Sequence, residues 1–482
     1  MIRISGPASD VCLQSLLRKP DGKDSILPKP RMASLRRIYC PSTRDLLDQA
    51  LVLRFPGPNS FTGEDVVEVH VHGSRAVIAG VFGALETCNG LSLDGSGGRV
   101  RPAERGEFTR RAFGNGRMDL TEVEGLSDLL EAETAMQRKQ ALTQMEGHMR
   151  LVFEGWRDVL IKCLAHTEAV IDFGDDAQED DIDDSAMLVL VPRVEALRNE
   201  VEAHLRDGRK GEIIREGVRI ALVGPPNAGK SSLMNALARR PAAIVAPTAG
   251  TTRDIIELRL DLAGVPCIVS DTAGLRDHSD DPIELEGIRR AREALDRADV
   301  KVYVGDASDH ASWNIARDMF SAAVVDGRRG RERDTAGHGG IGQGECILVL
   351  NKIDVKDVSP SPSTPSAGSG TMVDVRHGEK GAFYISCTTG EGIPNLESAL
   401  TDRIHNMLQS SSQEGALITR ERHRAHMQQC LVHLDGFLRN VVMMDVAAEE
   451  LRLAMSEIGK VTGRVDVEQL LDVIFRDFCI GK

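Results

Sequence analysis

The sequence has few of the residues that several protein classes depend on. Aromatic residues make up only 4% of it, which argues against an aromatic platform for stacking single-stranded nucleic acid. No apolar run approaches the roughly 20 residues that cross a bilayer. The nine cysteines include no CxxC pair. Neither a zinc knuckle nor a disulfide framework is therefore indicated, and a reducing compartment fits best.

Positive charge is also in short supply. Lys and Arg number 59 against 73 Asp and Glu, a net charge of −14. An acidic chain does not hold nucleic acid by bulk attraction, so any such contact must be local or shared with a basic partner. The remaining composition, 41% hydrophobic and 27% charged, is that of a globular protein. A length of 482 residues predicts two to four domains.

The chain opens without a basic, apolar signal peptide and without an Arg/Ser-rich transit sequence. Residues 1–7, MIRISGP, look like the end of a strand that runs into a turn. The protein is therefore either cytosolic, or the chain begins inside a longer precursor.

Residues 1–115 carry short β-like runs broken by turns and predict a small α+β domain. One run, residues 50–55, ends at a Pro-Gly-Pro turn. Residues 66–72 alternate, with valines on one face and Glu68, His70 and His72 on the other. The two histidines suggest a metal site, but without further ligands a pocket-lining or solvent-facing role is favoured.

The pattern of apolar residues in 116–213 predicts helices. Val123, Leu126 and Leu130 recur with helical spacing, as do the apolar residues from Phe153 to Leu164. Seven of the ten residues from 175 to 184 are acidic. We expect this run to be a solvated connection before a helix at 191–205, with a metal or partner site as the alternative.

Residues 214–395 alternate apolar strands with helical stretches, which predicts a parallel α/β sheet. The strands are expected at 218–223, 267–270, 300–304, 347–350 and 383–386. Two Gly-, Ser-, Pro- and Arg-rich tracts, 326–344 and 359–370, are expected to be mobile loops. Residues 396–482 are helical again, so a helical domain in two segments, 116–213 and 396–482, is predicted to hold an inserted α/β domain.

The inserted domain carries a P-loop at 224–231, GPPNAGKS. Backbone N–H groups at a helix N-terminus converge on phosphate there, with Lys230 reaching the β- and γ-phosphates and Ser231 binding Mg²⁺. The alternative is a Gly-rich turn that binds nothing. The β-run before this motif and the helical run after it favour the phosphate site.

Four further elements follow in the order expected of a GTP-binding domain. A DTAG motif places a carboxylate in the shell around the metal, and an NKID motif lets Asp354 accept two hydrogen bonds from guanine, which adenine cannot offer. A loop at 386–388 supports the base, and 250–254 is the switch I candidate. The predicted nucleotide-binding residues are Asn227, Ala228, Gly229, Lys230, Ser231, Ser232, Thr251, Thr252, Asp271, Thr272, Ala273, Gly274, Asn351, Lys352, Asp354, Ser386 and Cys387.

The residue after the DTAG motif shapes the mechanism. Many GTPases place a glutamine there to orient the attacking water, whereas this chain has Leu275. Another group must orient the water, and Glu284 is a candidate. An acid at the start of a helix is the alternative explanation of Glu284. Asn227 offers an oxygen suited to a monovalent cation, or it is a simple turn residue.

These motifs resemble the MnmE (TrmE) family of tRNA-modification GTPases, and specifically its mitochondrial members. The resemblance covers nearly the whole chain and includes residues 55–65 (FPGPNSFTGED), 105–113 (RGEFTRRAF), 271–276 (DTAGLR) and 478–482 (FCIGK). It implies an N-terminal folate-binding dimerisation domain, a discontinuous helical domain and an inserted Ras-like P-loop G domain. A homodimer would act with an FAD-dependent partner to install an aminomethyl-type group, with taurine or glycine as amine, on the wobble uridine of tRNA.

The resemblance also implies several site residues. Potassium would bind at Asn227, Ala246, Thr248 and Thr251, and Mg²⁺ at Ser231 and Thr252. Glu284 would be the catalytic glutamate. 5-Formyltetrahydrofolate, or a related one-carbon folate, would bind at Arg3, Glu68, Arg117 and Lys482.

Cys479 would be essential to the modification, although a cysteine near an apolar C-terminus is usually a small buried hydrophobe. The chain departs from the family in lacking the Gly-rich segment and first strand before Arg3, and in having Arg117 where a lysine is usual. A mitochondrial location is implied. The sequence leaves two other functions open: a regulatory GTP-binding switch, such as a ribosome-assembly GTPase, and a folate-binding scaffold with an inert G domain.

Overall fold

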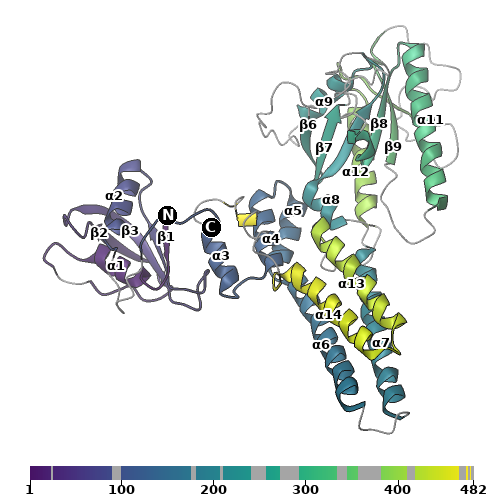
Figure 1. The fold of residues 1–482 in the computed structure, drawn as a ribbon. Helices are drawn as coiled ribbons and strands as arrows, with labels where there is room; N and C mark the ends of the chain where they lie inside the picture. Colours follow the sequence, from purple (N-terminus) through teal and green to yellow (C-terminus); the bar gives the residue numbers. More distant parts are fainter. Residues whose placement is uncertain are drawn as a thin grey trace, which may run out of the picture. The chain divides into compact units, whose positions relative to one another are not determined.

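A computed structural model of the chain describes residues 1–22, 25–89, 99–174, 181–206, 210–239, 257–271, 293–333, 345–355, 382–409, 418–465, 474–475 and 478. The chain forms two compact units (Figure 1). The first contains residues 1–127, 145–154 and 458–482, and the second contains 128–144 and 155–457. The domain boundaries at 115, 213 and 395 stay a prediction.

A four-stranded antiparallel sheet with strand order β1-β4-β3-β2 forms the core of the first unit. The strands are β1 (Ile2–Ser5), β2 (Ser34–Tyr39), β3 (Leu46–Phe55) and β4 (Val66–His70). As the alternation predicts, Val67 and Val69 are buried and His70 is exposed. Helices α1 (Ser9–Leu17) and α2 (Arg75–Glu86) bury Leu13 and Val81 against the valine face. The small α+β domain is confirmed.

The first unit also holds α3 (Glu107–Gly114) and the beginning of α4 (Leu120–Glu131). Val123 of α4 packs against Phe475 and Phe478. The apolar residues near the end of the sequence therefore belong to a buried cluster with α4.

A six-stranded sheet with strand order β10-β9-β8-β5-β7-β6 forms the centre of the second unit. All its neighbours are parallel except β6 and β7. Ile220 and Leu222 face one core, whereas Ala221 and Val223 face another, which explains the continuous apolar run at 220–223 in β5. The strands are β5 (Val218–Val223), β6 (Glu257–Leu262), β7 (Val265–Asp271), β8 (Val300–Asp306), β9 (Glu345–Asn351) and β10 (Ala382–Tyr384).

Helices cover both faces of this sheet (Figure 1). The core with Ile220 includes residues of α9 (Lys230–Ala238) and α12 (Ile393–Gln409), and the core with Ala221 includes residues of α11 (His310–Arg333). The other helices are α5 (Ala135–Met145), α6 (His148–Gly174), α7 (Asp181–Leu205), α8 (Lys210–Glu216), α13 (Glu421–Arg439) and α14 (Met444–Thr462). The predicted multidomain α/β and α fold class is confirmed.

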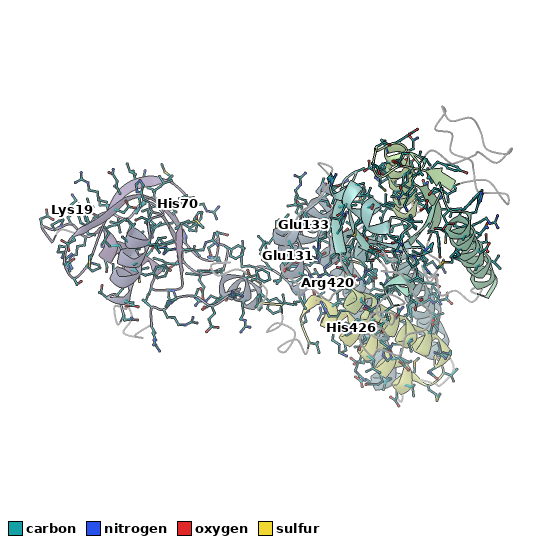
Figure 2. All side chains as sticks on the ribbon, turned by 90° about the horizontal axis from the view of Figure 1, so that it is seen from above. Lys19, His70, Glu131, Glu133, Arg420 and His426 are labelled. Atoms are coloured by element: carbon teal, nitrogen blue, oxygen red, sulfur yellow. The ribbon has the colours of Figure 1, made fainter. Side chains whose placement is uncertain are left out.

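Ion pairs join the long helices of the second unit. Arg198 of α7 donates to Asp435 of α13 across 3.1 Å. His426 of α13 (labelled in Figure 2) lies 2.7 Å from Glu457 of α14, and His433 lies 2.7 Å from Glu450. The two histidines are seven residues apart and therefore lie on one face of α13.

Three sequence predictions of local structure are wrong in part. Helix α7 begins at Asp181, so residues 181–184 are helical, because acidic side chains are favoured at a helix N-terminus. Helix α11 continues to Arg333, because Arg and Glu form helices well enough to offset two glycines. Strand β10 ends at Tyr384, before the predicted residue 386. Residues 175–180, 334–344 and 359–370 lie outside the described part.

Within the described residues, the structure contains no helix with both the length and the apolar content that a membrane span requires.

Candidate nucleotide-binding site

The P-loop lies at the carboxyl end of β5. The strand ends at Val223 and α9 begins at Lys230, so residues 224–229 form the loop. Gly224 has a φ of 156°, and a Cβ on it would lie 2.1 Å from the carbonyl oxygen of Val304. Gly229 has a φ of 94°. Because only glycine fits both positions, the loop conformation follows from the motif.

Lys230 and Ser231 sit in the first turn of α9. The Nζ of Lys230 donates to the carbonyl oxygens of Gly224 and Pro225, at 2.9 and 3.1 Å, so the ammonium group lies over the loop. Burial lowers the pKa of Lys230. An ammonium group beside the N-terminus of a helix is the arrangement expected of a phosphate site.

A candidate magnesium site lies where α9 faces the end of β7. The Ser231 hydroxyl donates to Asp271 Oδ2. Asp271 Oδ1 is buried and has no hydrogen-bond partner within the described residues. Hydroxyl and carboxylate oxygens are the ligands that Mg²⁺ takes beside phosphates. The residues present therefore fit a magnesium ion, with Ser231 as direct ligand and Asp271 beside it.

The NKID motif begins at the last residue of β9, Asn351. Its side-chain amide donates to the carbonyl oxygen of Ala228 at 3.2 Å, and its Oδ1 accepts from the N–H of Cys387 at 3.2 Å. Asp354 is exposed. Burial and the nearby carboxylate of Asp354 raise the pKa of the Cys387 thiol to about 11. The structure thus brings the phosphate loop and both predicted base elements together.

The loop after β10 is held by a buried serine. Ser386 is fully buried, and its Oγ accepts from the N–H groups of Thr388 and Thr389 at 3.2 and 3.1 Å. The strand ends before Ser386 because the backbone N–H of Ser386 donates to the carbonyl oxygen of Glu391, at 2.9 Å, and not to β9.

One residue of this edge has no place in the predicted site. Asp306, the last residue of β8, accepts from Lys352 Nζ at 2.5 Å. Burial opposes ionisation of Asp306, but hydrogen bonds from Lys352 and Ser308 outweigh it and hold the carboxyl pKa below its usual range. The one feature of the sequence that could have indicated Asp306 as a site residue is its position at the end of an apolar strand.

Asn227 is exposed and has a φ of 62°, a left-handed conformation that Asn tolerates better than most residues. Ser232 follows on α9 and is also exposed. The remaining predicted residues of the nucleotide, metal and catalytic sites lie outside the described residues: Ala246, Thr248, Thr251, Thr252, Thr272, Ala273, Gly274 and Glu284.

Two of the predicted folate residues meet in the first unit. Arg3 of β1 and Glu68 of β4 are opposite each other in the sheet, and the guanidinium donates to Glu68 Oε1 at 3.0 and 2.8 Å. The guanidinium carbon lies 5.6 Å from the centre of the Phe61 ring and 5.8 Å from that of Phe108. Arg117 is exposed. Cys479 and Lys482 lie outside the described residues.

Sequence reasoning missed a polar cluster next to this pair. Ser5 Oγ lies 2.7 Å from Thr62 Oγ1 and donates to Glu64 at 2.8 Å. Arg111 donates to Glu64 at 3.0 Å and to Glu107 at 2.6 Å. Four of these residues, all but Ser5, lie in the two N-terminal segments that resemble the family, but spacing alone could not show that the segments meet.

The two histidines of the β4 region have carboxylate neighbours. His70 (labelled in Figure 2) lies 3.7 Å from Glu68, and His72 lies 2.8 Å from Asp48. In the described ranges, no three His, Cys, Asp or Glu residues are grouped so as to hold a metal ion.

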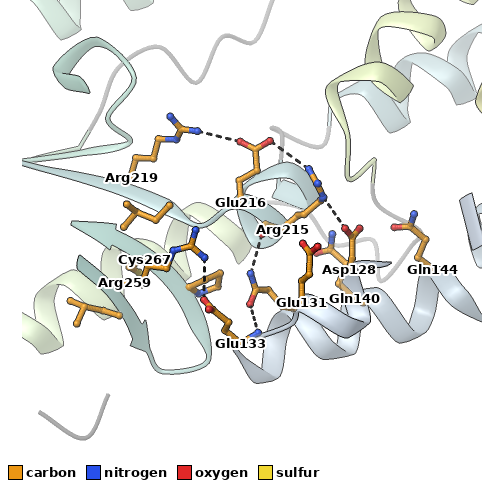
Figure 3. Close-up of a pocket in the computed structure, with 15 residues that line it drawn as sticks. Asp128, Glu131, Glu133, Gln140, Gln144, Arg215, Glu216, Arg219, Arg259 and Cys267 are labelled. Atoms are coloured by element: carbon orange, nitrogen blue, oxygen red, sulfur yellow. Dashed lines mark hydrogen bonds and ion pairs between the residues drawn. The ribbon is translucent and has the colours of Figure 1, made fainter. Parts of the chain in front are cut away.

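A cavity of about 410 Å³ lies in the second unit, and no P-loop residue lines it (Figure 3). Asp128 accepts from Arg215 at 3.0 Å, and Arg259 lies 3.4 Å from Glu133. The N–H of Met136 donates to Gly264, in the turn between β6 and β7, at 3.2 Å. Helix α5 is therefore hydrogen-bonded to the β6–β7 hairpin, which follows the switch I candidate at 250–254.

The site defines a class of protein. A P-loop GTPase has three parts that are found here: a P-loop after β5, a carboxylate at the end of β7 and an NKID motif that begins at the end of β9. A model of the GTP-binding protein TrmE N-terminus matches residues 1–117, and a model of the MnmE helical domain matches residues 120–479.

Three relatives match the whole chain. A mitochondrial 5-taurinomethyluridine-[tRNA] synthase subunit GTPB3 from Homo sapiens is 45% identical over 482 residues, and its Danio rerio counterpart is 43% identical over 483; the chain spans 90% of each. A tRNA modification GTPase MnmE from Parvibaculum lavamentivorans is 44% identical over 486 residues, and the chain spans 96% of it. The chain belongs to the MnmE (TrmE) family.

Proposed function

We propose that this chain is a GTP hydrolase whose nucleotide cycle serves the modification of the wobble uridine of tRNA. The observation that carries the proposal is the junction at Asn351, which joins the phosphate loop at Ala228 to the base loop at Cys387. Relatives at 43–45% identity over the whole chain bear the names of tRNA-modification GTPases or of 5-taurinomethyluridine synthase subunits.

Two ions would add positive charge to that of Lys230 beside the phosphates. Ser231 and Thr252 would hold Mg²⁺, which would supply positive charge to the phosphates. Potassium at Asn227, Ala246, Thr248 and Thr251 would supply the charge that an arginine finger gives in other GTPases. The family resemblance and the exposed, left-handed Asn227 support this role.

Glu284 replaces the missing glutamine as the group that orients water. Leu275 has no hydrogen-bonding group, so it can neither orient nor polarise water. We expect Glu284→Ala to slow turnover while nucleotide affinity is kept, because the side chain would act on the attacking water and not on the bound nucleotide. An unimpaired rate in this variant would remove Glu284 from the mechanism.

The chain works as a homodimer with an FAD-dependent partner protein, in mitochondria, and uses a one-carbon folate. The word "subunit" in the names of two relatives supports a partner, and their mitochondrial names support the location. The cation of Arg3, held by Glu68, supports an anion-binding folate pocket with Arg117 and Lys482. Cys479 would act near the transferred carbon.

Nucleoside analysis of tRNA tests the function. Cells that lack the protein should lose the wobble modification, and the wild-type chain should restore it while Ser231→Ala does not. Unchanged wobble uridines would favour the rival function, a regulatory switch. GTP turnover in KCl and NaCl tests the hydrolytic mechanism separately, because equal rates in both salts would leave potassium without a role.

A further inference from the structure

Asp306 is a buried carboxylate at the nucleotide edge of the sheet that belongs to none of the GTPase motifs. It ends β8 and stands opposite Asn351 of β9 in the strand register. Only 8% of its surface is exposed. A carboxylate seldom lies that deep unless it is paired, and a negative charge close to nucleotide phosphates is unfavourable without a cation.

The carboxylate of Asp306 is fixed by the backbone around it. Its Oδ1 accepts from the N–H and the hydroxyl of Ser308, at 2.9 and 2.6 Å. Its own N–H donates to the hydroxyl of Ser312 at 3.1 Å. The next N–H, of Ala307, donates to the carbonyl oxygen of Asn351 at 2.8 Å. The second oxygen, Oδ2, is therefore held in a defined place beside the NKID motif.

Lys352 is the group that this second oxygen binds. Its Nζ lies 2.5 Å from Asp306 Oδ2, and its backbone has a φ of 68°. The side chain is 36% exposed, and Lys352 stands between Asn351 and Asp354 in the sequence. A lysine side chain is flexible, and it loses rotamer freedom when a ligand orders it.

We propose that Asp306 is a positioning residue for the guanine base: it holds Lys352 across the base site before nucleotide arrives. The methylene chain then offers a ready apolar surface to the face of the base, while Asp354 binds its edge. Binding is then stronger, because the Lys352 side chain has already lost its rotamer freedom before the nucleotide binds. The inference rests on the proposed assignment of Asn351, Lys352 and Asp354 as the base site.

The position of the Asp306–Lys352 pair predicts how nucleotide binding changes when the pair is broken. The pair would act at the base end of the site and not at the γ-phosphate, so the affinities for GTP and for GDP should fall equally. Asp306→Asn keeps the acceptor for Ser308 but turns an N–H group toward the Lys352 ammonium. We expect the dissociation constants of both fluorescent nucleotides to rise about three- to tenfold, and KM for GTP to rise with kcat unchanged.

A double-mutant cycle separates positioning from a general structural role. Lys352→Ala should cause a loss of similar size, and Asp306→Asn should add little to it, because the residues act as one unit. Asp309→Asn is the matched control. Asp309 is an exposed carboxylate of the same loop that caps α11 through the N–H groups of Ala311 and Ser312, and its loss should leave affinity unchanged.

The double-mutant cycle tests the positioning role of Asp306, and a separate variant tests the assignment of the base site. Additive losses in the cycle, an effect on GTP alone, or wild-type affinity in Asp306→Asn would overturn the positioning role. Asp354→Asn tests the base site itself: if it keeps full GDP affinity, the proposed base site is wrong. The nucleotide-binding fraction is titrated for each preparation. Should Asp306→Asn not fold, Asp306→Ser takes its place in the double-mutant cycle, and the same outcomes decide the proposal.

Discussion

Asn351 donates a hydrogen bond from its side-chain amide to the carbonyl oxygen of Ala228, with 3.2 Å between the two atoms. The two residues are 123 positions apart in the sequence. The bond is buried, and the same side chain accepts from the N–H of Cys387. One amide therefore sets the distance between the loop that binds phosphate and the loops that bind the base. Loss of this contact should disturb both ends of the nucleotide together.

Gly229→Ala tests this contact directly. A Cβ on Gly229 would lie 2.1 Å from Asn351 Nδ2, so the amide must move. The left-handed φ of 94° adds strain of about 1–2 kcal/mol for a residue with a side chain. We expect the affinity for GTP and GDP to fall at least tenfold and the urea midpoint to fall. Equilibrium titration and urea unfolding would measure the two effects.

Gly390→Ala is the control for backbone strain in the same unit. Gly390 has a φ of 82°, and no atom lies within 4 Å of its added Cβ. It should therefore lower stability through strain alone and keep much more nucleotide affinity than Gly229→Ala. Equal losses of affinity in the two variants would show that the contact with Asn351 is unimportant.

Asp354→Asn should change the preferred base. The carboxylate of Asp354 is expected to accept from two N–H groups of guanine, whereas an asparagine amide can donate to the second carbonyl oxygen of xanthine. We expect affinity for GTP to fall at least a hundredfold and XTP to become the preferred nucleotide. Competition between the two nucleotides measures the exchange, and a variant that still prefers GTP would contradict the assignment.

Much of the G domain could be predicted from the sequence because its signals are local. A glycine loop between an apolar strand and a helix, as at Gly224 and Gly229, has one common structural solution. The strands at 218–223 and 300–304 are apolar except for Arg219 and Lys301, because both faces of the sheet are covered. These predictions need only a window of about ten residues.

The remaining parts depend on contacts between distant residues. In the sequence, Asp306 is only the last residue of an apolar strand. Its role depends on Lys352, which is 46 positions later and lies beside it only in the folded chain. The Ser5, Thr62 and Arg111 cluster draws on three separate segments. The helix ends at Asp181 and Arg333 were missed because composition indicates loops there, whereas acidic residues are favoured at a helix N-terminus and Arg and Glu have good helix propensity.

Asp128 should be a centre of stability in the second unit. Its Oδ1 accepts from Arg215 at 3.0 Å and from Arg420 at 2.8 Å (Arg420 is labelled in Figure 2), and 12% of the side chain is exposed. Asp128→Asn removes the charge that holds the two arginines, which are themselves partly exposed. We expect the free energy of unfolding to fall by about 1–3 kcal/mol, less than for a fully buried pair.

Urea unfolding at neutral pH would measure this change. Asp158→Asn is the matched control, because Asp158 is an exposed carboxylate of α6 and its loss should change stability by less than about 0.5 kcal/mol. A fall no larger than that of the control would contradict the role of Asp128. Arg215→Ala and Arg420→Ala should not be additive, since both remove a partner of one oxygen.

Asp119 gives the first unit a pH-dependent stability. Its Oδ1 accepts from the N–H of Glu122 and the hydroxyl of Thr121, both at 2.8 Å, at the start of α4. Its other oxygen is buried without a partner among the described residues. Burial raises the pKa of Asp119 despite these hydrogen bonds. The folded state therefore holds the proton more tightly than the unfolded state does.

The sign of the effect follows from this difference in proton binding. Between the ordinary Asp pKa of about 4 and the raised value in the folded state, the folded state binds more protons, so the free energy of unfolding falls as pH rises. Asp119→Asn removes this contribution but keeps an acceptor for Glu122. The free energy of unfolding of Asp119→Asn minus that of the wild type should therefore increase from pH 4 to pH 7.

Asp119→Ala also removes the helix cap. Its free energy of unfolding should be lower than that of Asp119→Asn by about 1 kcal/mol at every pH. A difference between Asp119→Asn and wild type that stays constant, or that decreases with pH, would show that Asp119 is ionised as readily in the folded chain as in the unfolded one.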